Sequence, residues 1–527
     1  MARSVIAAVA ALAAAASIAA AGARPAHASP LFELVGGGRG TGGFNPRVTG
    51  AGPSSTYFNP ALLAHAEQTF ELGVFFLTEQ ISIDVDARAD SPQCESFSAA
   101  SSSTTCDVPV VFGTGPESFR HGDGSQLANP GLPTEWLENG VEGELEARPR
   151  QGDGSGSNSH AYQVIGLVNP IFADRLVLGF YAMIPLSQFT TAKAFYNDER
   201  EQFFSNSLHP ELYADRLTAT SLAFGGGGRI TDELSAGLSF TLNLRNKAAA
   251  PVYISNLADL NTVLLDSDIG VQASVSPHFG VIYDPIDDLR LAATLHTTQS
   301  LEIETGFDYV IATGVEQGTT VSFTHAYMPW TAALAASYDL TGDISLAATT
   351  AFARWSNYQD RHSERPHPDY VWRDTISGSA GVRYHRRALH TFLDVAYQPS
   401  PVPPQTGRSN YVDNDRVGAS TGADYQFALW GGTFQVGVVL QGQWLLSRHV
   451  TKFSTPDNPQ PNPNQPGFGD NHYPQLVIDE VPDDAVDGVL GDPVPNREGL
   501  QTNNPGFPGF GSEGWVLGGA LNLAILY

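Results

Sequence analysis

The chain is poor in several residue types that would mark particular kinds of protein. Its 527 residues include only two Cys and three Met, and 28 Lys and Arg stand against 55 Asp and Glu. Two cysteines exclude a disulfide-built scaffold and a multi-cysteine metal site. The net charge of −27 argues against a nucleic-acid partner, because phosphate recognition needs a basic surface. We therefore expect no nucleic acid, no metal and no cofactor.

Long apolar runs are missing beyond the N-terminus. The chain starts with a basic residue, Arg3, continues in an Ala-rich apolar run and reaches the small-x-small sequence Ala26-His27-Ala28. This three-part pattern predicts a signal peptide over residues 1–28. No later stretch approaches the ~20 apolar residues of a membrane-spanning helix. An exported chain of this kind is either soluble or a membrane β-barrel.

Apolar and polar residues alternate along most of the remaining chain. Residues 234–245, 289–298, 434–446 and 515–527 each place one apolar and one polar face on an extended strand. The segments are long enough to cross a bilayer when tilted, and tight and long connections alternate between them. Aromatic residues near strand ends, such as Tyr338, Trp355 and Trp444, are typical of interfacial girdles. These features favour a transmembrane barrel over a soluble sandwich.

The expected fold is all-β: a transmembrane antiparallel β-barrel of about fourteen strands over residues 69–527. The predicted strands are 69–83, 160–171, 175–185, 215–229, 234–246, 271–283, 289–303, 329–339, 343–356, 371–385, 388–398, 416–428, 433–450 and 514–527. The predicted long extracellular loops are 84–159, 186–214, 247–270, 304–328, 355–370, 399–415 and 451–513.

Residues 29–68 precede the first strand and are predicted to form a plug inside the barrel. A barrel of this size has a lumen that something must fill or gate. The segment is rich in glycine and carries a compact apolar set that a disordered tail would not usually contain. A flexible periplasmic tail is the alternative. The expected plug residues are Tyr57, Phe58, Asn59, Pro60, Ala61 and Leu62.

Two loops carry further features. Cys94 and Cys106 lie in one Ser/Thr-rich stretch, and an oxidising compartment favours a disulfide between them over two free thiols. Residues 455–512 are rich in Asp, Pro and Asn. Because the acidic residues lack the spacing of a calcium-binding loop, a solvated loop is the expected structure.

Several stretches, in order along the chain, resemble the FadL/TodX-type family of outer-membrane transporters. These stretches are Ser55–Ala64, with its Asn-Pro-Ala sequence, Leu289–Thr294, Met328–Ala347, Ala353–Tyr358, and Tyr397–Pro403 followed by Asp413–Gly418. The resemblance implies a fourteen-stranded barrel around an N-terminal hatch. One departure is Leu62, where the family pattern has glycine. This departure and the long loops bear on which substrate the protein carries more than on its fold.

The resemblance also implies a function, which is transport of hydrophobic molecules such as long-chain fatty acids across the outer membrane of a Gram-negative cell. It implies capture by the external loops, binding in the lumen, hatch movement and lateral release into lipid. The alternative within the family is uptake of aromatic hydrocarbons. The expected partners are hydrophobic small molecules, outer-membrane lipid and lipopolysaccharide, and the barrel-assembly machinery, which would read the terminal strand ending at Tyr527. The chain is expected to be a monomer.

A fatty-acid carboxylate in the lumen would need a cation. The candidates on polar strand faces are Arg245, Arg290, His296 and Arg383. The alternative is that these side chains pair with lumen carboxylates, such as Asp394 and Asp424, or hold the plug.

Other classes of function are weaker alternatives. Gly418–Gly422 matches the string of a hydrolase nucleophile elbow around Ser420, but it lies in an alternating strand and not at a strand–turn–helix junction. No catalytic residue is therefore expected, and the protein is not expected to be an enzyme. A structural or adhesive barrel stays open because of the acidic loop, and a water-filled porin stays open unless the lumen is plugged.

Overall fold

A computed structural model describes residues 31–37, 42–85, 158–172, 175–186, 208, 212–213, 217, 220–249, 252–254, 263–265, 268–311, 315–359, 371–404, 411–451 and 509–527. Of residues 85, 172, 243–254, 263–274 and 300–326, only the backbone within these ranges is described. The predicted signal peptide, Cys94, Cys106 and residues 455–508 of the acidic loop lie outside the described residues.

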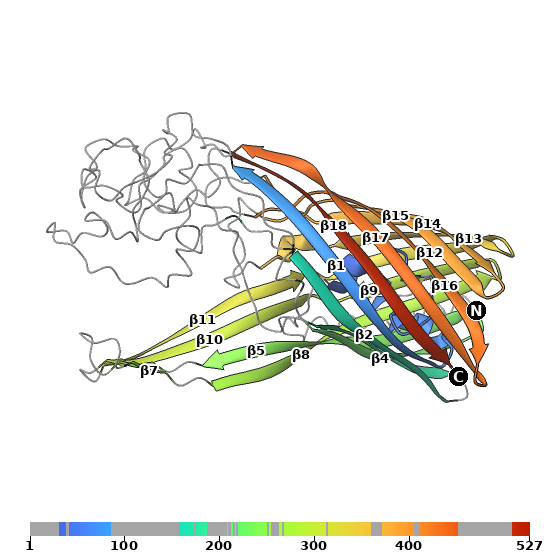
Figure 1. The fold of residues 1–527 in the computed structure, drawn as a ribbon, viewed down its shortest axis with the longest axis horizontal. Helices are drawn as coiled ribbons and strands as arrows, with labels where there is room; N and C mark the ends of the chain where they lie inside the picture. The colour runs from blue at the N-terminus through green and yellow to red at the C-terminus, as the bar shows by residue number, and fades with distance from the viewer. Residues whose placement is uncertain are drawn as a thin grey trace, which may run out of the picture.

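The wall of the molecule is a closed antiparallel barrel of fourteen strands (Figure 1). The strands are β1 Thr69–Val85, β2 Asn158–Phe172, β3 Leu176–Pro185, β4 Ser221–Arg229, β5 Leu234–Ala249, β8 Asp268–Ile286, β9 Leu289–His296, β12 Thr331–Thr341, β13 Ile344–Ala353, β14 Thr375–Arg386, β15 Leu389–Gln398, β16 Arg416–Leu429, β17 Gly432–Thr451 and β18 Gly509–Leu526. Each strand pairs with the next one around the wall, and β1 closes the ring by pairing with both β2 and β18. The predicted barrel is confirmed.

The two faces of the wall have the polarity that the alternation predicts. Large apolar side chains face outward, and Leu334 and Leu440 are 64% and 59% exposed. Polar side chains such as Ser239 and Thr241 face inward and are buried. Of the predicted girdle aromatics, Trp444 lies on the outer face, but Trp355 is buried in an aromatic cluster that the sequence did not predict.

The two ends of the barrel differ. At one end, which we call the turn end, short turns join β8 to β9, β12 to β13, β14 to β15 and β16 to β17. The turn between β16 and β17 has only two residues, Trp430 and Gly431, and both have the positive φ that such a hairpin needs. The C-terminus also lies at this end (Figure 1), and we call the opposite end, where β1 and β17 end, the loop end.

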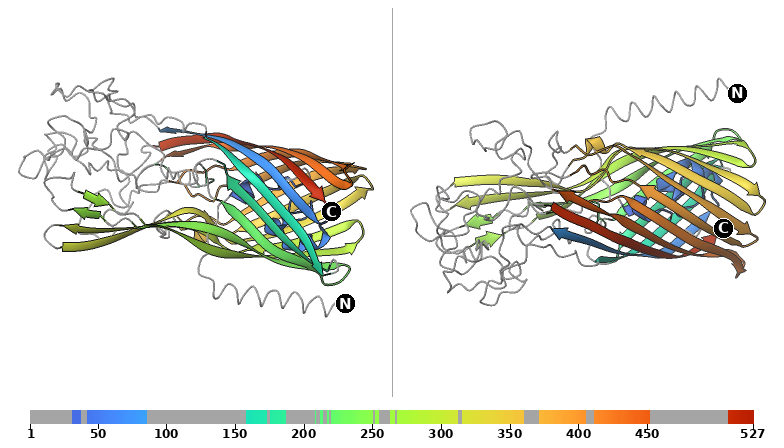
Figure 2. Two further views of the ribbon diagram at one scale, coloured as in Figure 1. Left: turned by 60° about the horizontal axis from the view of Figure 1, so that its bottom comes forward. Right: turned by 90° about the horizontal axis from the view of Figure 1, so that it is seen from above.

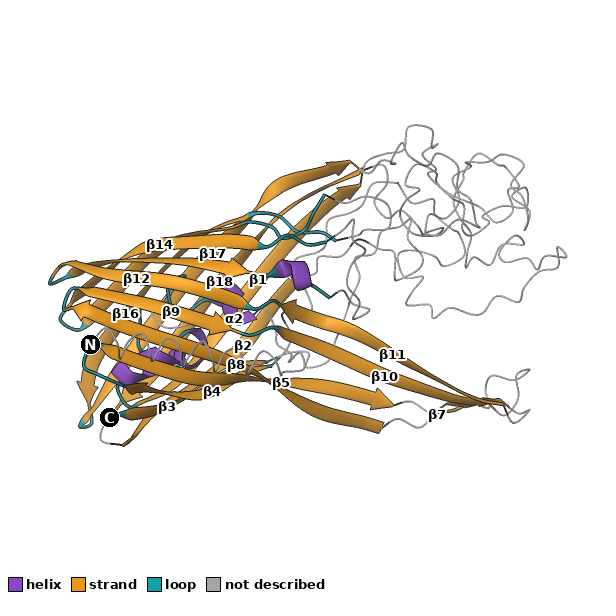
Figure 3. Ribbon diagram, turned by 180° about the vertical axis from the view of Figure 1, so that it is seen from behind, coloured by secondary structure: helices purple, strands orange, loops and turns teal. Residues whose placement is uncertain are grey.

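One predicted strand and two predicted loops need correction. The strand predicted over 289–303 ends at His296, and the predicted loop 304–328 belongs to a hairpin of β10 (Gln299–Ile311) and β11 (Val315–Met328). The predicted loop 247–270 contains two short paired strands, β6 (Val252–Ile254) and β7 (Val263–Leu265). The abundance of β-branched and aromatic residues in these stretches favours extended pairing. The β10–β11 hairpin projects beyond the barrel wall (Figures 1 and 3).

The N-terminal segment, described over residues 31–37 and 42–68, is enclosed by the strands (Figure 2). It contains α2 (Leu31–Val35), α3 (Ser55–Phe58) and the 3₁₀ helix η1 (Pro60–His65). Asn59 caps η1 by accepting a hydrogen bond from the Ala61 N–H, and Pro60 occupies a first-turn position that needs no N–H donor. Among the described residues, no helix has the length and apolar character needed to cross a bilayer.

Candidate functional site

The Asn-Pro-Ala part of the N-terminal segment packs on glycines of the wall. A Cβ atom added at Gly280 of β8 would lie 2.0 Å from Oδ1 of Asn59. One added at Gly237 of β5 would lie 2.3 Å from the carbonyl carbon of Pro60. These glycines let the backbone of the segment approach the strands more closely than any side chain would allow. Tyr57, Phe58, Asn59, Pro60, Ala61 and Leu62 are all buried in this packing.

A network of charged and polar groups centres on Glu33 of α2. Its Oε1 atom accepts hydrogen bonds from Arg47 Nη2 at 2.6 Å and from the Tyr57 hydroxyl at 3.1 Å. The Nδ1 atom of His296, on β9, lies 3.5 Å from the same oxygen. Nε2 of His296 is 3.2 Å from the carbonyl oxygen of Phe58. The network therefore joins three parts of the N-terminal segment to one strand of the wall.

Electrostatics keep this network in a defined protonation state. Burial alone would raise the pKa of Glu33, but the positive charge of Arg47 and hydrogen bonds from His296 and Arg47 outweigh burial and lower the pKa to about 2. Burial and the neighbouring Glu33 charge raise the pKa of Tyr57 well above its usual value. Glu33 is therefore a carboxylate and Tyr57 a neutral donor at ordinary pH.

A second attachment joins the turn at Gly42–Thr49 to β14 and β15. Arg383 pairs with Asp394 through two hydrogen bonds, and both side chains are buried. Asp394 Oδ2 accepts the N–H of Phe44 at 2.8 Å, and Arg383 Nη2 donates to the carbonyl of Gly42 at 3.3 Å. Charge-assisted hydrogen bonds of this kind are about twice as strong as neutral ones.

Neutral hydroxyls complete that attachment. Ser379 of β14 donates to the Phe44 carbonyl or to Asn45 Oδ1, each at 2.9 Å. Thr349 of β13 donates to the same Asn45 oxygen at 2.9 Å. Three adjacent strands therefore hold one turn of the N-terminal segment.

On the loop side of the N-terminal segment lies a cavity of about 110 Å³. We call it the loop-side cavity. Its apolar lining includes Phe44, Phe58, Met328 and Trp355, and its polar lining includes Glu33, Arg47 and Arg416.

A buried aromatic cluster surrounds Trp355. Tyr358 stacks on Trp372 with ring centroids 3.6 Å apart, and Tyr327, Trp355 and Tyr411 pack around this pair. The cluster joins the loop-side cavity to the loop end through apolar groups. The sequence indicated only that Trp355 ends a strand, because Trp372 and Tyr411 come from distant connections.

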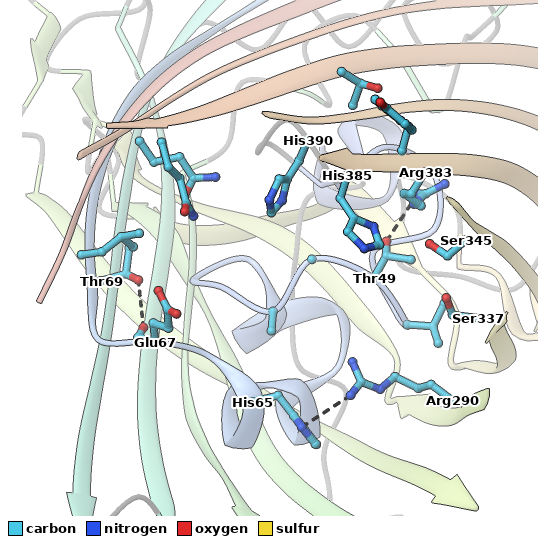
Figure 4. A pocket seen from close by; sticks show the side chains of 18 residues that line it. Thr49, His65, Glu67, Thr69, Arg290, Ser337, Ser345, Arg383, His385 and His390 are labelled. Carbon is cyan, nitrogen blue, oxygen red and sulfur yellow. Dashed lines mark hydrogen bonds between the residues drawn. The ribbon is translucent and has the colours of Figure 1, made fainter. Parts of the chain in front are cut away.

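On the opposite side, at the turn end, lies a polar cavity of about 380 Å³ (Figure 4). We call it the turn-side cavity. Thr49 and His65 of the N-terminal segment line it, together with Arg290, Arg383 and two further histidines. Burial, reinforced by the positive charge of Arg290, lowers the pKa of His65 to about 4, so this imidazole is neutral at ordinary pH. The N-terminal segment therefore separates a cavity of mixed lining, which includes aromatic rings, from a more polar one.

The structure places the four predicted cation candidates apart. Arg290 is paired with Asp284 at 3.0 Å and lies 3.5 Å from His65 (Figure 4). His296 and Arg383 contact the N-terminal segment, as described above. Arg245 lies in β5, but its side chain is outside the described set. For Arg290, His296 and Arg383 the geometry favours the alternative in which these groups pair internally or hold the segment.

Glu33, Arg47 and Arg416 belong to no motif in the sequence that marks them as lumen residues. Glu33 and Arg47 are two of the few charged residues in the segment before the first strand, and this scarcity is the one signal that marks them. Arg416 belongs to the Asp-Arg sequence at the start of β16, which indicates the entry to a strand and not a lumen cation.

The fold and the lumen define a class: a β-barrel with an apolar outer face whose own N-terminal segment divides the lumen. Residues 201–439 match the family model described as outer membrane protein transport protein (OMPP1/FadL/TodX). The match agrees with the resemblance to this family that the sequence carries. The family is one of outer-membrane transport proteins and not of enzymes.

Solved structures provide further comparisons. The crystal structure of a Pseudomonas aeruginosa FadL homologue is 14% identical, covers 96% of this chain and 98% of its own, and has a TM-score of 0.48. The Pseudomonas putida toluene transporter TodX is 12% identical, with coverages of 94% and 99% and a TM-score of 0.46. The Ralstonia pickettii toluene transporter TbuX is 10% identical, with coverages of 95% and 98% and a TM-score of 0.39. No protein with a curated description matches the chain.

Proposed function

We propose that this protein transports hydrophobic small molecules across the outer membrane of a Gram-negative cell. The observation that carries the proposal is the loop-side cavity, which is lined partly by aromatic rings and is closed on one side by the N-terminal segment. Apolar molecules partition from water into such a site with about 25 cal/mol per Å² of buried apolar surface. A water-filled porin would instead keep its lumen open.

The proposed route begins at the loop end, which faces the outside. A ligand enters the aromatic cluster, reaches the loop-side cavity and contacts the N-terminal segment, which acts as a hatch. The segment then moves, and the ligand leaves sideways through the wall into lipid. The polar turn-side cavity supports this direction, because an apolar molecule would be poorly solvated there.

The size of the loop-side cavity favours a compact ligand. It measures about 110 Å³, and an engineered apolar cavity of about 150 Å³ holds one benzene molecule. We therefore propose a molecule the size of one aromatic ring as the preferred ligand, in agreement with the aromatic-hydrocarbon alternative that the family resemblance implies.

A fatty acid is the second candidate, and Arg416 is the observation that favours it. Its side chain lines the loop-side cavity, with the guanidinium 5.5 Å from the centre of the Tyr213 ring. An arginine at an apolar cavity is suited to pairing with a carboxylate. An extended acyl chain would need more room than this cavity provides.

We further infer that the protein is a monomer in contact with outer-membrane lipid and lipopolysaccharide, inserted by the barrel-assembly machinery. A closed ring of strands supports this, because it leaves no open sheet edge in the wall for pairing with another chain.

Uptake in a strain lacking the gene tests the proposed function. We expect uptake of radiolabelled toluene to fall on deletion, to recover with the wild-type gene and to recover with a Ser420→Ala variant, which removes the only nucleophile-elbow match. Unchanged uptake on deletion would favour an adhesive or structural role. Deleting residues 29–50 should leave a leaky, unselective barrel, whereas normal selective uptake by this deletion would contradict the hatch model.

A further inference from the structure

The hairpin of β14 and β15 places two imidazoles opposite each other inside the barrel. His385 and His390 are direct cross-strand partners, and their ring centroids are 6.2 Å apart. Both side chains lie on the inward face of the wall, because each is an even number of residues along its strand from a buried residue, Arg383 or Asp394. We propose that this pair binds a divalent transition-metal ion, such as Zn²⁺ or Cu²⁺, in the turn-side cavity.

The histidines are accessible to an ion from the cavity. Both line the turn-side cavity, and Figure 4 shows the two rings side by side within it. Among the described residues, neither ring makes a hydrogen bond that would occupy its nitrogens. In the neutral imidazole one ring nitrogen keeps a lone pair for a metal.

The spacing of the rings matches two ligands of one ion. An ion about 2.1 Å from an imidazole nitrogen lies about 3.2 Å from the ring centre. Two such ring centres are then about 5.3 Å apart at a tetrahedral angle and about 6.4 Å apart across the ion. The observed 6.2 Å falls within this range, so the two rings are spaced to share one ion when side-chain rotation turns a nitrogen of each towards it.

The surroundings provide a polar but incomplete ligand shell. Within the described ranges, no three His, Cys, Asp or Glu side chains are already gathered as a metal site. Two imidazoles are therefore the protein ligands, and water fills the other positions. The nearby charges have both signs: Asp424 is in register with His390 on the next strand, Arg383 is neutralised by Asp394, and the exposed Arg386 and Arg387 end β14 and begin the turn.

A site for hard cations such as Ca²⁺ is built from carboxylates and differs from an imidazole site in its ligand chemistry. Imidazole nitrogen favours Zn²⁺, Cu²⁺ and Ni²⁺, whereas Ca²⁺ and Mg²⁺ prefer oxygen. The acidic loop of this chain offers mainly oxygen ligands of that second type, and His472 is its one imidazole.

Copper binding to the untagged full-length protein in detergent tests the proposal. Cu²⁺ is titrated at substoichiometric amounts, and electron paramagnetic resonance counts the coordinating nitrogens. We expect a 1:1 signal with two imidazole nitrogens, and a loss of affinity of at least about tenfold in His385→Asn and in His390→Asn. His160→Asn, at the loop end of β2, is the matched control and should bind as the wild type does.

Resistance of the folded barrel to SDS on unheated gels confirms that each variant folds, and a variant that fails this check is replaced by His385→Gln or His390→Gln. A two-nitrogen signal that survives in the His385→Asn/His390→Asn double variant overturns the proposal. The absence of any nitrogen-coordinated copper in the wild type also overturns it. Because these readouts do not depend on transport, they are independent of the proposed function.

Discussion

Arg383 on β14 and Asp394 on β15 form a buried ion pair whose remaining hydrogen-bonding capacity is directed at the N-terminal segment. Asp394 accepts the Phe44 N–H and Arg383 donates to the Gly42 carbonyl. The pair is therefore both a part of the wall and an attachment point for the segment that divides the lumen.

We expect Asp394→Ala to loosen the N-terminal segment. The substitution leaves Arg383 buried without a counter-charge and removes the acceptor of the Phe44 N–H, at a cost of about 3–5 kcal/mol. Single-channel conductance in planar bilayers should rise, and protease should cleave the segment faster. Asp343→Asn, at an exposed turn, is the control. Conductance equal to that of the wild type would show that the pair does not hold the segment.

Gly280→Ala should displace the Asn-Pro-Ala part of the segment. The new Cβ would lie 2.0 Å from Oδ1 of Asn59, which already caps η1. Since Asn59 also donates to the Arg47 carbonyl, the displacement should spread to the Glu33 network. Ligand uptake and protease protection should both fall. Gly342→Ala, which has no atom within 4 Å of its new Cβ, should leave both unchanged. Equal behaviour of the two variants would contradict the close packing.

The attachment of the N-terminal segment to the barrel wall should weaken in acid because of Glu33. Its pKa is lowered from 4.5 to about 2 in the seated segment. A lowered carboxyl pKa contributes stability above pH 4.5, and this contribution is lost as the pH falls towards 2. The loss is on the order of 3 kcal/mol. Digestion of the segment by pepsin, a protease that is stable in acid, measures this loss of stability between pH 4.5 and 2.

Glu33→Gln is the matched variant for this effect, because the amide has nearly the same shape but does not titrate. We expect its segment to be less protected at pH 5 and to show a flatter pH profile. A profile as steep as that of the wild type would assign the acid effect to other carboxyl groups.

Arg416→Met distinguishes the two ligand classes. The methionine keeps the apolar stem of the side chain but removes the charge that would pair with a carboxylate. We expect toluene to quench the intrinsic tryptophan fluorescence of the wild type and of this variant with similar affinity, whereas oleate binding, if the wild type shows it, should weaken about tenfold or more in the variant. An equal loss of affinity for toluene and for oleate would mean that Arg416 shapes the cavity and does not select a charged ligand.

Much of the wall follows from residues that are close in sequence. The alternation in residues 234–245 and 434–446 predicts both strands and the face that each residue occupies, because successive side chains point to opposite sides. The strand limits agree within a few residues at most positions. They fail at 289–303, where one run of strand-forming residues contains two separate strands, β9 and the start of β10. Local β-propensity does not indicate at which residue a strand leaves the barrel wall.

The lumen could be anticipated only in part. The buried apolar residues from Tyr57 to Leu62 and the possible pairing of a lumen cation with Asp394 were visible in the sequence. The convergence of Glu33, Arg47 and His296 was not, because His296 is more than two hundred residues from the other two along the chain.

The sequence by itself determined which side chains meet lipid and which meet the interior, since a period of two is a local property of extended backbone. Only the closed structure decided which inward groups meet one another. Strand register and the path of the N-terminal segment set those contacts, and both depend on pairing between residues that are distant in the chain.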